Sequence, residues 1–312
     1  MDIFGTVVET GARFFVEAAI AAAHQLGLFR ALSSGSMTLD ELARAIGVDA
    51  GLHRLRALVD VLAATGVLVV DRSGATPRFS APSAVPAQPA VARAGWGLLA
   101  DVIRGNRPLL VEDEALQAFH AHLATAGAAA ARELASLLEG ESLLDLGAGA
   151  GVYSKAFLDA RPAGRATLVD TRDVLAIARE WMDGMDERAG RARFVEGEAS
   201  GLDVGNDHDI ALLANVLHLH PEDMCARLCA AAARAVVPGG VVVIKDLRID
   251  EDRSGPLEGL LFALNMAVYT EAGDVYPTSQ LRAWLGDAGL VDIVERRLDA
   301  APDAIVVIAR RP

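Results

Sequence analysis

The stretch Leu143-Leu-Asp-Leu-Gly-Ala-Gly-Ala-Gly151 decides how this chain folds. Its apolar first half has the composition of a buried strand, and helical spacing of apolar residues follows its last glycine. Three glycines in alternate positions, Gly147, Gly149 and Gly151, let the backbone turn sharply into that helix and approach a bound ligand closely. The stretch therefore predicts the first strand, loop and helix of a parallel α/β sheet.

Further short apolar runs with helical stretches between them extend this unit along the chain. Five of them are expected to be parallel strands, at residues 142–146, 166–170, 192–195, 209–214 and 240–246. Two more runs, residues 291–297 and 304–309, are separated only by a short Asp/Pro turn, so they are expected to pair antiparallel. The second half of the chain is therefore predicted to be a five-stranded parallel sheet closed by a C-terminal hairpin.

The glycine loop also indicates which ligand it suits. It contains no Gly-Lys-Ser/Thr, and Val152 stands where a dinucleotide fingerprint has its third glycine. Asp145 would repel a pyrophosphate but tolerate an ammonium or a sulfonium, and Asp170, which ends the next strand, suits the two hydroxyls of a ribose. These residues favour S-adenosylmethionine over NAD, and a purely structural turn is the third alternative.

The first 80 residues form a different pattern. Residues 3–32 have apolar side chains at helical spacing and few charges, which favours a helix covered by a second subunit over one buried within its own chain. A capping box, Thr38 to Glu41, opens a short helix that stops at Gly47. Asp49 is expected to cap a second helix, whose buried stripe is Leu52, Leu55, Leu58, Val59 and Leu62.

Two predicted strands, residues 66–71 and 74–80, complete a winged helix-turn-helix. A DNA-binding regulator is the alternative function that this motif raises. Its second helix offers only Arg54 and Arg56 beside His53, which is too few cations for a recognition face. A scaffold for dimerisation is therefore the favoured interpretation.

The composition narrows the class of protein further. Lys and Arg number 29 against 42 Asp and Glu, a formal net charge of −13, which argues against nucleic acid or an anionic membrane as the partner. The chain is 52% hydrophobic and shows neither a signal peptide nor a membrane span. Cys225 and Cys229 are expected to be reduced thiols in a cytoplasmic protein.

A Pro- and Ala-rich stretch, residues 81–94, is expected to be a linker, and helical spacing returns from Trp96 to Leu138. The predicted organisation is a winged-helix dimerisation domain at 1–95, connecting helices that line an acceptor pocket at 96–140, and a cofactor-binding catalytic domain at 141–312.

The whole chain resembles the S-adenosylmethionine-dependent small-molecule O-methyltransferases, the family of the plant caffeate-type enzymes and of bacterial relatives that tailor polyketides and antibiotics. The resemblance rests on the glycine loop, on Leu212-Leu-Ala-Asn-Val-Leu-His218, on Val237-Pro-Gly-Gly240 and on the C-terminal hairpin. It implies a methyltransferase sheet behind a winged helix that dimerises the protein instead of binding DNA.

The resemblance also assigns cofactor contacts. Gly147, Gly149 and Gly151 would surround the methionine part of S-adenosylmethionine, near Asp145, and S-adenosylhomocysteine would be the product. Asp170 would hold the ribose, with Thr171 beside the adenine. Where the family has Gly-Asp after the third strand, this chain has Gly197-Glu198 followed by Ala199, which keeps the carboxylate. Asn215 would lie near both the cofactor and the acceptor.

The same resemblance implies the proton chemistry. His218 falls where the family places its general base, within Leu-His-Asp-Trp, but this chain reads Leu217-His-Leu-His220. Asp246 takes the place of a glutamate that orients the base and is expected to accept the second imidazole N–H. The family's other supporting glutamate is replaced by Val275.

An acceptor pocket is expected from aromatic and polar side chains: Trp96, Phe119, His122, Asn265, Met266 and Tyr269. Two His-x-His pairs, at 120/122 and 218/220, raise the alternative of a metal site, although no metal is expected because no carboxylate partner is evident.

The predicted function is methyl transfer to a hydroxyl of a small aromatic or polyketide-like secondary metabolite by a cytoplasmic homodimer. C-methylation and cofactor-assisted cyclisation without methylation are the alternatives on the same fold.

Overall fold

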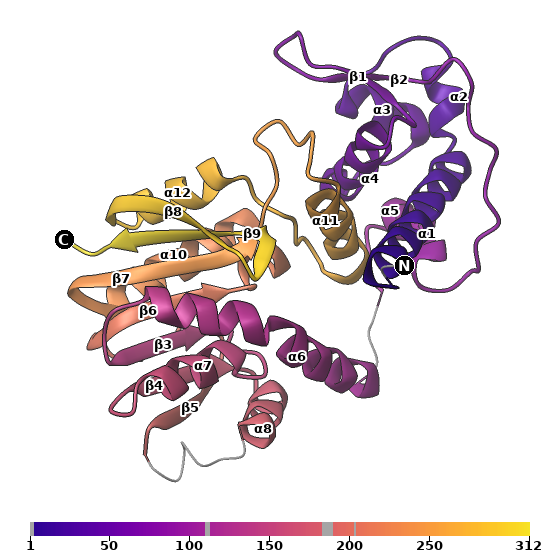
Figure 1. Cartoon of the computed structure of the whole chain (residues 1–312). Helices are drawn as coiled ribbons and strands as arrows, with labels where there is room; N and C mark the ends of the chain where they lie inside the picture. The colour runs from indigo at the N-terminus through magenta and orange to yellow at the C-terminus, as the bar shows by residue number, and fades with distance from the viewer. Residues whose placement is uncertain (1–2, 110–112, 183–189, 203) are drawn as a thin grey trace. The chain divides into compact units, whose positions relative to one another are not determined.

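The computed structural model describes residues 3–109, 113–182, 190–202 and 204–312, and gives side-chain surroundings for these residues except 3–11 and 113–124. The chain forms two compact units (Figure 1). Unit 1 contains Met1–Leu110 and Ile249–Val275, and unit 2 contains Val111–Arg248 and Tyr276–Pro312. The domains expected from the sequence were continuous along the chain. Unit 1 instead includes the late segment Ile249–Val275, because a helix of this segment packs against a helix of the N-terminal part.

Unit 1 is mainly helical. Its helices are α1 (Ile3–Leu26), α2 (Leu28–Leu32), α3 (Leu39–Ile46), α4 (Leu52–Ala64), the 3-10 helix η1 (Gly95–Leu98), α5 (Leu99–Gly105) and α11 (Leu257–Tyr269). The two strands β1 (Val69–Asp71) and β2 (Arg78–Ser80) pair antiparallel, as expected for the wing.

The local signals of the winged helix are confirmed in part. The Thr38 side chain accepts the Glu41 N–H, and the Glu41 carboxylate accepts the Thr38 N–H at 2.9 Å, so the capping box is formed. Gly47 ends α3 in the left-handed conformation, with φ of 71°.

Three details of this region differ from the expectation. Gly27, with φ of 78°, divides the predicted helix 3–32 into α1 and α2. Asp49 does not cap α4, because the helix begins at Leu52 and its N-cap residue is Gly51, with φ of 72° and no side-chain cap. Leu52 is 39% exposed and lies outside the buried stripe.

The helix that would read DNA in a winged helix, α4, packs against α11. Arg54 is fully buried on this side, where its guanidinium donates to the carbonyl oxygens of Ala267 and Glu271 and to Asn106 Oδ1. One of the two arginines available for phosphate contacts is therefore used inside the fold.

A buried ion triad fixes the segment before α11. The Arg253 guanidinium contacts Asp60 at 2.6 Å and Asp274 at 2.9 Å, and all three side chains are at most 13% exposed. Arg253 itself has a left-handed backbone, with φ of 55°. The triad joins α4 to both ends of the segment 249–275.

Unit 2 is built on a seven-stranded sheet. The strands are β3 (Ser142–Leu146), β4 (Arg165–Asp170), β5 (Ala192–Glu196), β6 (His208–Ala214), β7 (Val236–Leu247), β8 (Val291–Leu298) and β9 (Ala301–Arg310). Their order is β5-β4-β3-β6-β7-β9-β8. The first five strands in this order run parallel, and β9 is antiparallel to both of its neighbours, β7 and β8, which confirms the predicted sheet and hairpin.

Helices cover both faces of this sheet (Figure 1). On one face α10 (Glu222–Ala235) and α12 (Thr278–Asp287) bury Leu144, Ile244 and Val307. On the other, α6 (Asp113–Leu137), α7 (Val152–Ala160) and α8 (Arg172–Trp181) bury Leu143, Val243 and Val306. Alternation along each strand thus assigns successive residues to opposite cores. Each buried leucine or isoleucine contributes about 1.5–3 kcal/mol by leaving water.

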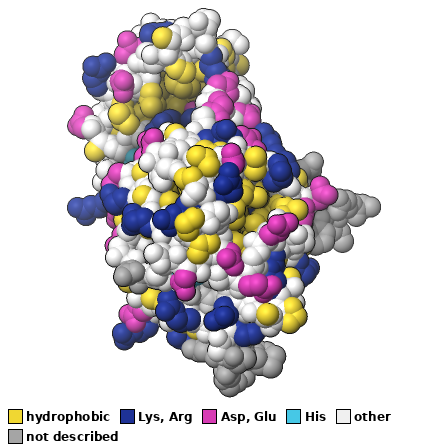
Figure 2. Space-filling model, turned by 90° about the vertical axis from the view of Figure 1, so that its left-hand side faces the viewer, with side chains coloured by type: hydrophobic (Ala, Val, Ile, Leu, Met, Phe, Trp, Pro, Cys, Tyr) yellow, Lys and Arg dark blue, Asp and Glu magenta, His cyan; other side chains and the backbone are white. Residues whose placement is uncertain are grey.

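The surface carries charges of both signs. Figure 2 shows Lys and Arg side chains interspersed with Asp and Glu over one face. This pattern is unlike the continuous basic stripe of a nucleic-acid interface. Among the helices in the described ranges, none has the length and apolar character needed to cross a bilayer. Cys225 and Cys229 are free and buried, as expected.

Candidate active site

The glycine loop lies at the carboxyl end of β3 and is shaped by contacts that exclude side chains. Gly147 has φ of 74°, and a Cβ there would lie 2.6 Å from the Val216 Cγ2 atom. Gly151 has φ of 77°, and its Cβ would lie 2.7 Å from the Met182 sulfur. Both positions therefore require glycine, and the loop approaches the ends of β4 and β6 as close as backbone allows.

Asp170, at the end of β4, holds the loop in place. Its Oδ2 atom accepts the Gly149 N–H at 2.9 Å, and its Oδ1 atom accepts the Thr171 N–H at 2.7 Å. A carboxylate has about four lone-pair positions, so two backbone bonds leave it capacity for the hydroxyls of a ribose. The glycine loop and the Asp170 carboxylate are therefore suited to a nucleoside with an amino-acid tail. The geometry of the site thus fits S-adenosylmethionine, the expected cofactor.

Asp145 lies beneath the loop and is almost completely buried, at 1% exposure. It accepts a hydrogen bond of 2.6 Å from the Ser154 hydroxyl on α7. Burial raises the pKa of Asp145 to about 6, an effect that the Ser154 hydrogen bond opposes and the charge of Asp170 reinforces. A cationic group bound beside Asp145 would restore its ionised form.

His218 and Asp246 form a buried pair at the ends of β6 and β7. The 3-10 helix η2 (Leu217–Leu219) carries His218, and its Nδ1 atom lies 2.6 Å from Asp246 Oδ1. A carboxylate only accepts, so Nδ1 carries the proton and, in the neutral ring, Nε2 is the basic nitrogen. The hydrogen bond that the sequence led us to expect is thus present.

The charge of Asp246 is maintained by its neighbours. Burial opposes its ionisation, but the charge and hydrogen bond of His218, the Leu247 N–H and Lys245 outweigh burial and hold the pKa of Asp246 below its usual value. An ionised Asp246 stabilises the imidazolium that forms when His218 takes up a proton.

The turn that carries His218 is fixed from a neighbouring helix. The Cys225 thiol on α10 lies 3.2 Å from the Leu217 carbonyl oxygen, and the Tyr276 hydroxyl donates to the His220 carbonyl oxygen at 2.6 Å. Burial raises the pKa of the Cys225 thiol far above neutral, so this residue remains a thiol and not a nucleophile.

Asn215 lies just before this turn in a left-handed conformation, with φ of 58°. Its side-chain oxygen accepts a hydrogen bond of 2.7 Å from Lys245 Nζ, and its backbone N–H donates to the Lys245 carbonyl oxygen at 2.7 Å. The Tyr153 hydroxyl on α7 is the third member of the group: burial raises the pKa of Tyr153 to about 12, and a hydrogen bond with Asn215 opposes the rise.

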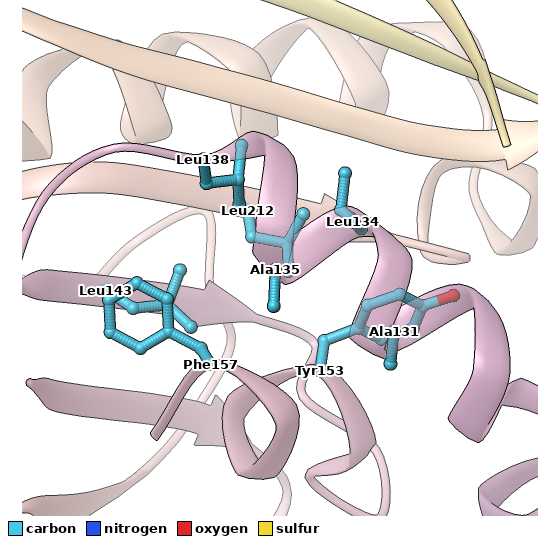
Figure 3. Close-up of a pocket in the computed structure, with 8 residues that line it drawn as sticks. All are labelled: Ala131, Leu134, Ala135, Leu138, Leu143, Tyr153, Phe157 and Leu212. Carbon is cyan, nitrogen blue, oxygen red and sulfur yellow. The ribbon is translucent and has the colours of Figure 1, made fainter. Parts of the chain in front are cut away.

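Tyr153 also borders a small apolar cavity of about 10 Å³ between α6, α7 and the sheet. In Figure 3 the Tyr153 ring lies beside Ala131, with its hydroxyl directed away from Leu143 and Phe157. The cavity is too small and too apolar for a substrate. It therefore belongs to the packing beneath the site.

The residues expected at the adenine lie beyond β5. Glu198 is exposed and accepts a 2.7 Å hydrogen bond from the Ser200 hydroxyl, while Ala199 packs against the core under α10 and α12. The exposed carboxylate is accessible to a ligand.

Four of the residues expected in the acceptor pocket lie in unit 1. The Trp96 indole N–H donates to Asn265 Oδ1 at 3.2 Å, and the Trp96 ring packs on Phe15 with ring centroids 4.5 Å apart. Met266 is buried, and burial raises the pKa of Tyr269. The side chains of Phe119 and His122 lie outside the described residues.

No cluster of three or more His, Cys, Asp or Glu side chains with the geometry of a metal site occurs among the residues that the structure describes. The side chains of His120 and His122 lie outside that set. His220 is half-buried, and burial, reinforced by the neighbouring His218, lowers its pKa.

Sequence reasoning missed several polar residues that the fold brings to this edge of the sheet. Ser154 and Tyr153 follow the glycine loop on α7, and Lys245 precedes Asp246. The signal for Lys245 was an isolated lysine that ends the run Val241-Val-Val-Ile244, because a cation inside a buried strand needs a partner.

Comparison with protein families gives two matches along the chain. Residues 112–291 match an O-methyltransferase domain, and residues 9–84 match an O-methyltransferase dimerisation domain. The two matches together leave out residues 1–8, 85–111 and 292–312.

Individual relatives extend over nearly the whole chain. The 3-hydroxy-5-methyl-1-naphthoate 3-O-methyltransferase of Streptomyces sahachiroi is 29% identical over 93% of this chain and 90% of its own. The tetracenomycin polyketide synthesis 8-O-methyl transferase of Streptomyces glaucescens is 25% identical over 99% and 97%. A family 2 O-methyltransferase structure from Planctomyces limnophilus has the same fold, with a TM-score of 0.77, 24% identity, and coverage of 100% and 97%.

Proposed function

Because this chain belongs to the S-adenosylmethionine-dependent O-methyltransferase family, we propose that it methylates a hydroxyl of a small aromatic or polyketide-like acceptor with His218 as the general base. The observation that carries the assignment of the base is the 2.6 Å contact between His218 Nδ1 and Asp246. The acceptor class is supported by the relatives that act on a naphthoate and in tetracenomycin synthesis.

S-adenosylmethionine supplies an electrophilic methyl group on a sulfonium. The residues of this chain align the acceptor oxygen, exclude water and remove one proton, and alignment alone provides much of the rate enhancement. His218 Nε2 would take up the proton that the acceptor hydroxyl loses when its oxygen is methylated. Asp246 balances the resulting imidazolium charge.

For cofactor binding we propose the residues at the carboxyl ends of β3, β4, β5 and β6. Gly147, Gly149 and Gly151 provide the cradle, and Asp170 the ribose contact. The remaining proposed contacts are Asp145, Thr171, Glu198, Ala199 and Asn215. The acceptor contacts stay a proposal as well, namely Trp96, Phe119, His122, Asn265, Met266 and Tyr269.

A variant of the base tests this proposal. We expect His218→Ala to lower kcat by about 10²–10⁴-fold, because general-base catalysis contributes on that order, while the Kd for S-adenosylhomocysteine changes little. Turnover is measured as S-adenosylhomocysteine release with a panel of hydroxynaphthoates and anthracyclic phenols, and Kd by calorimetry. Asp223→Asn on the exposed end of α10 is the matched control.

Two outcomes would contradict parts of the proposal. Unchanged turnover of His218→Ala would remove this residue from the base role. A product that gains no methyl group, or gains it on carbon, would replace O-methylation by one of the two alternatives on the same fold.

For the assembly we propose a homodimer formed through unit 1. Residues 9–84 match a dimerisation domain, and Phe14 on α1 and Leu52 on α4 are exposed, at 47% and 39%. We expect the dimer to cover Phe14, because association buries apolar side chains of the interface.

A further inference from the structure

Two consecutive residues of β7, Lys245 and Asp246, lie on opposite faces of the sheet. Val243 belongs to the core under α6, α7 and α8, and Ile244 to the core under α10 and α12. Alternation therefore places Lys245 on the α6/α7 face and Asp246 on the α10 face, where it meets His218. Asp246 serves the base, which leaves Lys245 without a role in the proposed reaction.

Lys245 is an unusual residue in this chain. Only two of the 29 cationic residues are lysines, Lys155 and Lys245. Lys155 lies on the surface of α7 in an ion pair with Asp159, whereas Lys245 is 7% exposed. A lysine is rarely buried unless it binds something, because its ammonium group loses its hydration.

The protein satisfies only part of this ammonium group. Within the described part of the chain, Nζ makes one hydrogen bond, to Asn215 Oδ1 at 2.7 Å. An ammonium has three N–H donors, so two remain for another acceptor. Burial lowers the pKa of Lys245, and the charge of Asp246 opposes this shift. An anionic acceptor on the same face would offset the cost of burial.

A buried charge of the opposite sign lies on the same face. Leu143 and Leu144 alternate between the two cores, so Asp145 shares the α6/α7 face with Lys245. In the register of β6, Asp145 pairs with Leu212 and Lys245 with Ala214. Their Cα atoms are therefore about 10 Å apart across the strands and about 7 Å along them.

The two charges do not neutralise each other. In the described part of the chain Asp145 accepts from the Ser154 hydroxyl, and Lys245 donates to Asn215 Oδ1. An anion and a cation that are buried on one face of the sheet, at this distance from each other, match a zwitterion. The amino-acid end of S-adenosylmethionine carries such a pair, an α-ammonium and an α-carboxylate.

We propose that Lys245 binds the α-carboxylate of the methionine end of the cofactor, opposite Asp145, which faces the α-ammonium. This inference rests on the proposed function. It adds a residue that distinguishes ligands with the α-carboxylate from ligands without it. Asn215 orients the lysine, since its side-chain oxygen accepts from Nζ and its backbone bonds to the Lys245 carbonyl. The end of β7 thus supplies one residue to the cofactor and the next to the base.

Binding measurements with three nucleosides test the inference without turnover. The probes are S-adenosylhomocysteine, its decarboxylated analogue S-(5′-adenosyl)-3-thiopropylamine, and 5′-methylthioadenosine, which lacks the whole amino-acid end. We expect Lys245→Met to weaken S-adenosylhomocysteine about 10–100-fold, as for a lost charge-assisted hydrogen bond. The other two ligands should bind Lys245→Met as they bind the wild type. The wild type should bind the decarboxylated analogue more weakly than S-adenosylhomocysteine by a similar factor.

Lys155→Met, the other lysine, is the matched control and should bind all three ligands as the wild type does. Equal weakening of S-adenosylhomocysteine and 5′-methylthioadenosine by Lys245→Met would show that the lysine acts through the fold, which overturns the inference. Unchanged affinity for S-adenosylhomocysteine would overturn it as well. A wild type that binds none of the nucleosides would instead overturn the proposed function, and this inference with it.

A second measurement covers the case in which Lys245→Met does not fold. Because the chain has two lysines, lysine labelled with ¹⁵N at Nζ gives at most two ammonium signals in the wild type. The signal that is missing from the spectrum of Lys155→Met belongs to Lys155, and the remaining signal belongs to Lys245. We expect the Lys245 signal to shift with S-adenosylhomocysteine but not with the decarboxylated analogue. Equal shifts with both ligands would contradict a carboxylate contact.

Discussion

At the scale of single residues, the site depends on how burial changes charge. Asp145 and Asp246 are both almost fully buried carboxylates, yet the pKa of Asp145 is raised and that of Asp246 lowered. Asp145 receives neutral donors from Ser154, its hydroxyl and its backbone N–H, whereas Asp246 receives the His218 ring and two backbone N–H groups. The number and charge of the donors, not the depth of burial, decide which carboxylate ionises readily.

We expect Asp246→Asn to lower kcat at least 10-fold and to move the acid limb of the pH–rate profile to lower pH. The neutral amide no longer stabilises the imidazolium, so proton uptake by the base becomes less favourable. The measurement is kcat against pH between 5 and 9. An unshifted profile would show that the carboxylate of Asp246 serves structure alone.

The raised pKa of Asp145 predicts how the free energy of unfolding depends on pH. Its pKa rises from 3.8 to about 6 on folding, so the folded state binds the proton more tightly than the unfolded state. The free energy of unfolding should therefore decrease as pH rises from about 4 to about 6, by at most about 3 kcal/mol. Asp145→Asn should remove this decrease, and Asp159→Asn on the surface should retain it. Urea titrations across that range measure both.

At the scale of elements, the segment that enters unit 1 late in the chain depends on buried polar contacts. Arg54 on α4 donates to the carbonyl oxygen of Ala267, in the last turn of α11 where a helix leaves its carbonyls without partners, and to that of Glu271 just after the helix. The triad of Arg253 with Asp60 and Asp274 joins α4 to both ends of the same segment. Apolar packing alone would not specify how α11 is oriented on α4.

We expect Arg54→Met to lower the free energy of unfolding by about 3 kcal/mol, because two carbonyl oxygens, one of them buried, and the Asn106 side-chain oxygen lose their donor. Arg44→Met on the exposed side of α3 should change it by less than about 0.5 kcal/mol. Urea denaturation followed by circular dichroism compares the two. Equal effects would contradict the capping role of Arg54.

At the scale of the whole molecule, the role that we propose for the winged helix is assembly of a dimer and not DNA binding. The chain carries a net charge of −13, and Arg54 is buried against α11. A dimer made through unit 1 accounts for the dimerisation-domain match and for the exposed Phe14.

Light scattering after size exclusion should give a mass of about twice 32.7 kDa. Phe14→Glu should shift it toward the monomer, because a charge placed in an apolar interface loses its hydration on association. Arg13→Glu, at the neighbouring and more exposed position, is the control and should remain dimeric. A Phe14→Glu protein that stays fully dimeric would place the interface elsewhere.

The sequence predicts those features of the fold and the site that depend on residues close together along the chain. The period of apolar residues and the turn-forming glycines act over a few positions, so the seven strands, the capping box and the glycine loop could all be predicted. Gly27 and Gly51 were misjudged because a left-handed glycine can end or begin a helix without any polar signal. Lys245 was missed because its partner, Asn215, lies 30 positions away.

The sequence by itself determined the α/β class, the family, and the residue types that meet at the carboxyl edge of the sheet, because those follow from local spacing and from motifs. Only the tertiary structure decided which of these residues pair: Asp246 with His218 on one face, and Lys245 with Asn215 on the other. The physical reason is that hydrogen bonds and buried charges act across strands that are adjacent in space but distant along the chain.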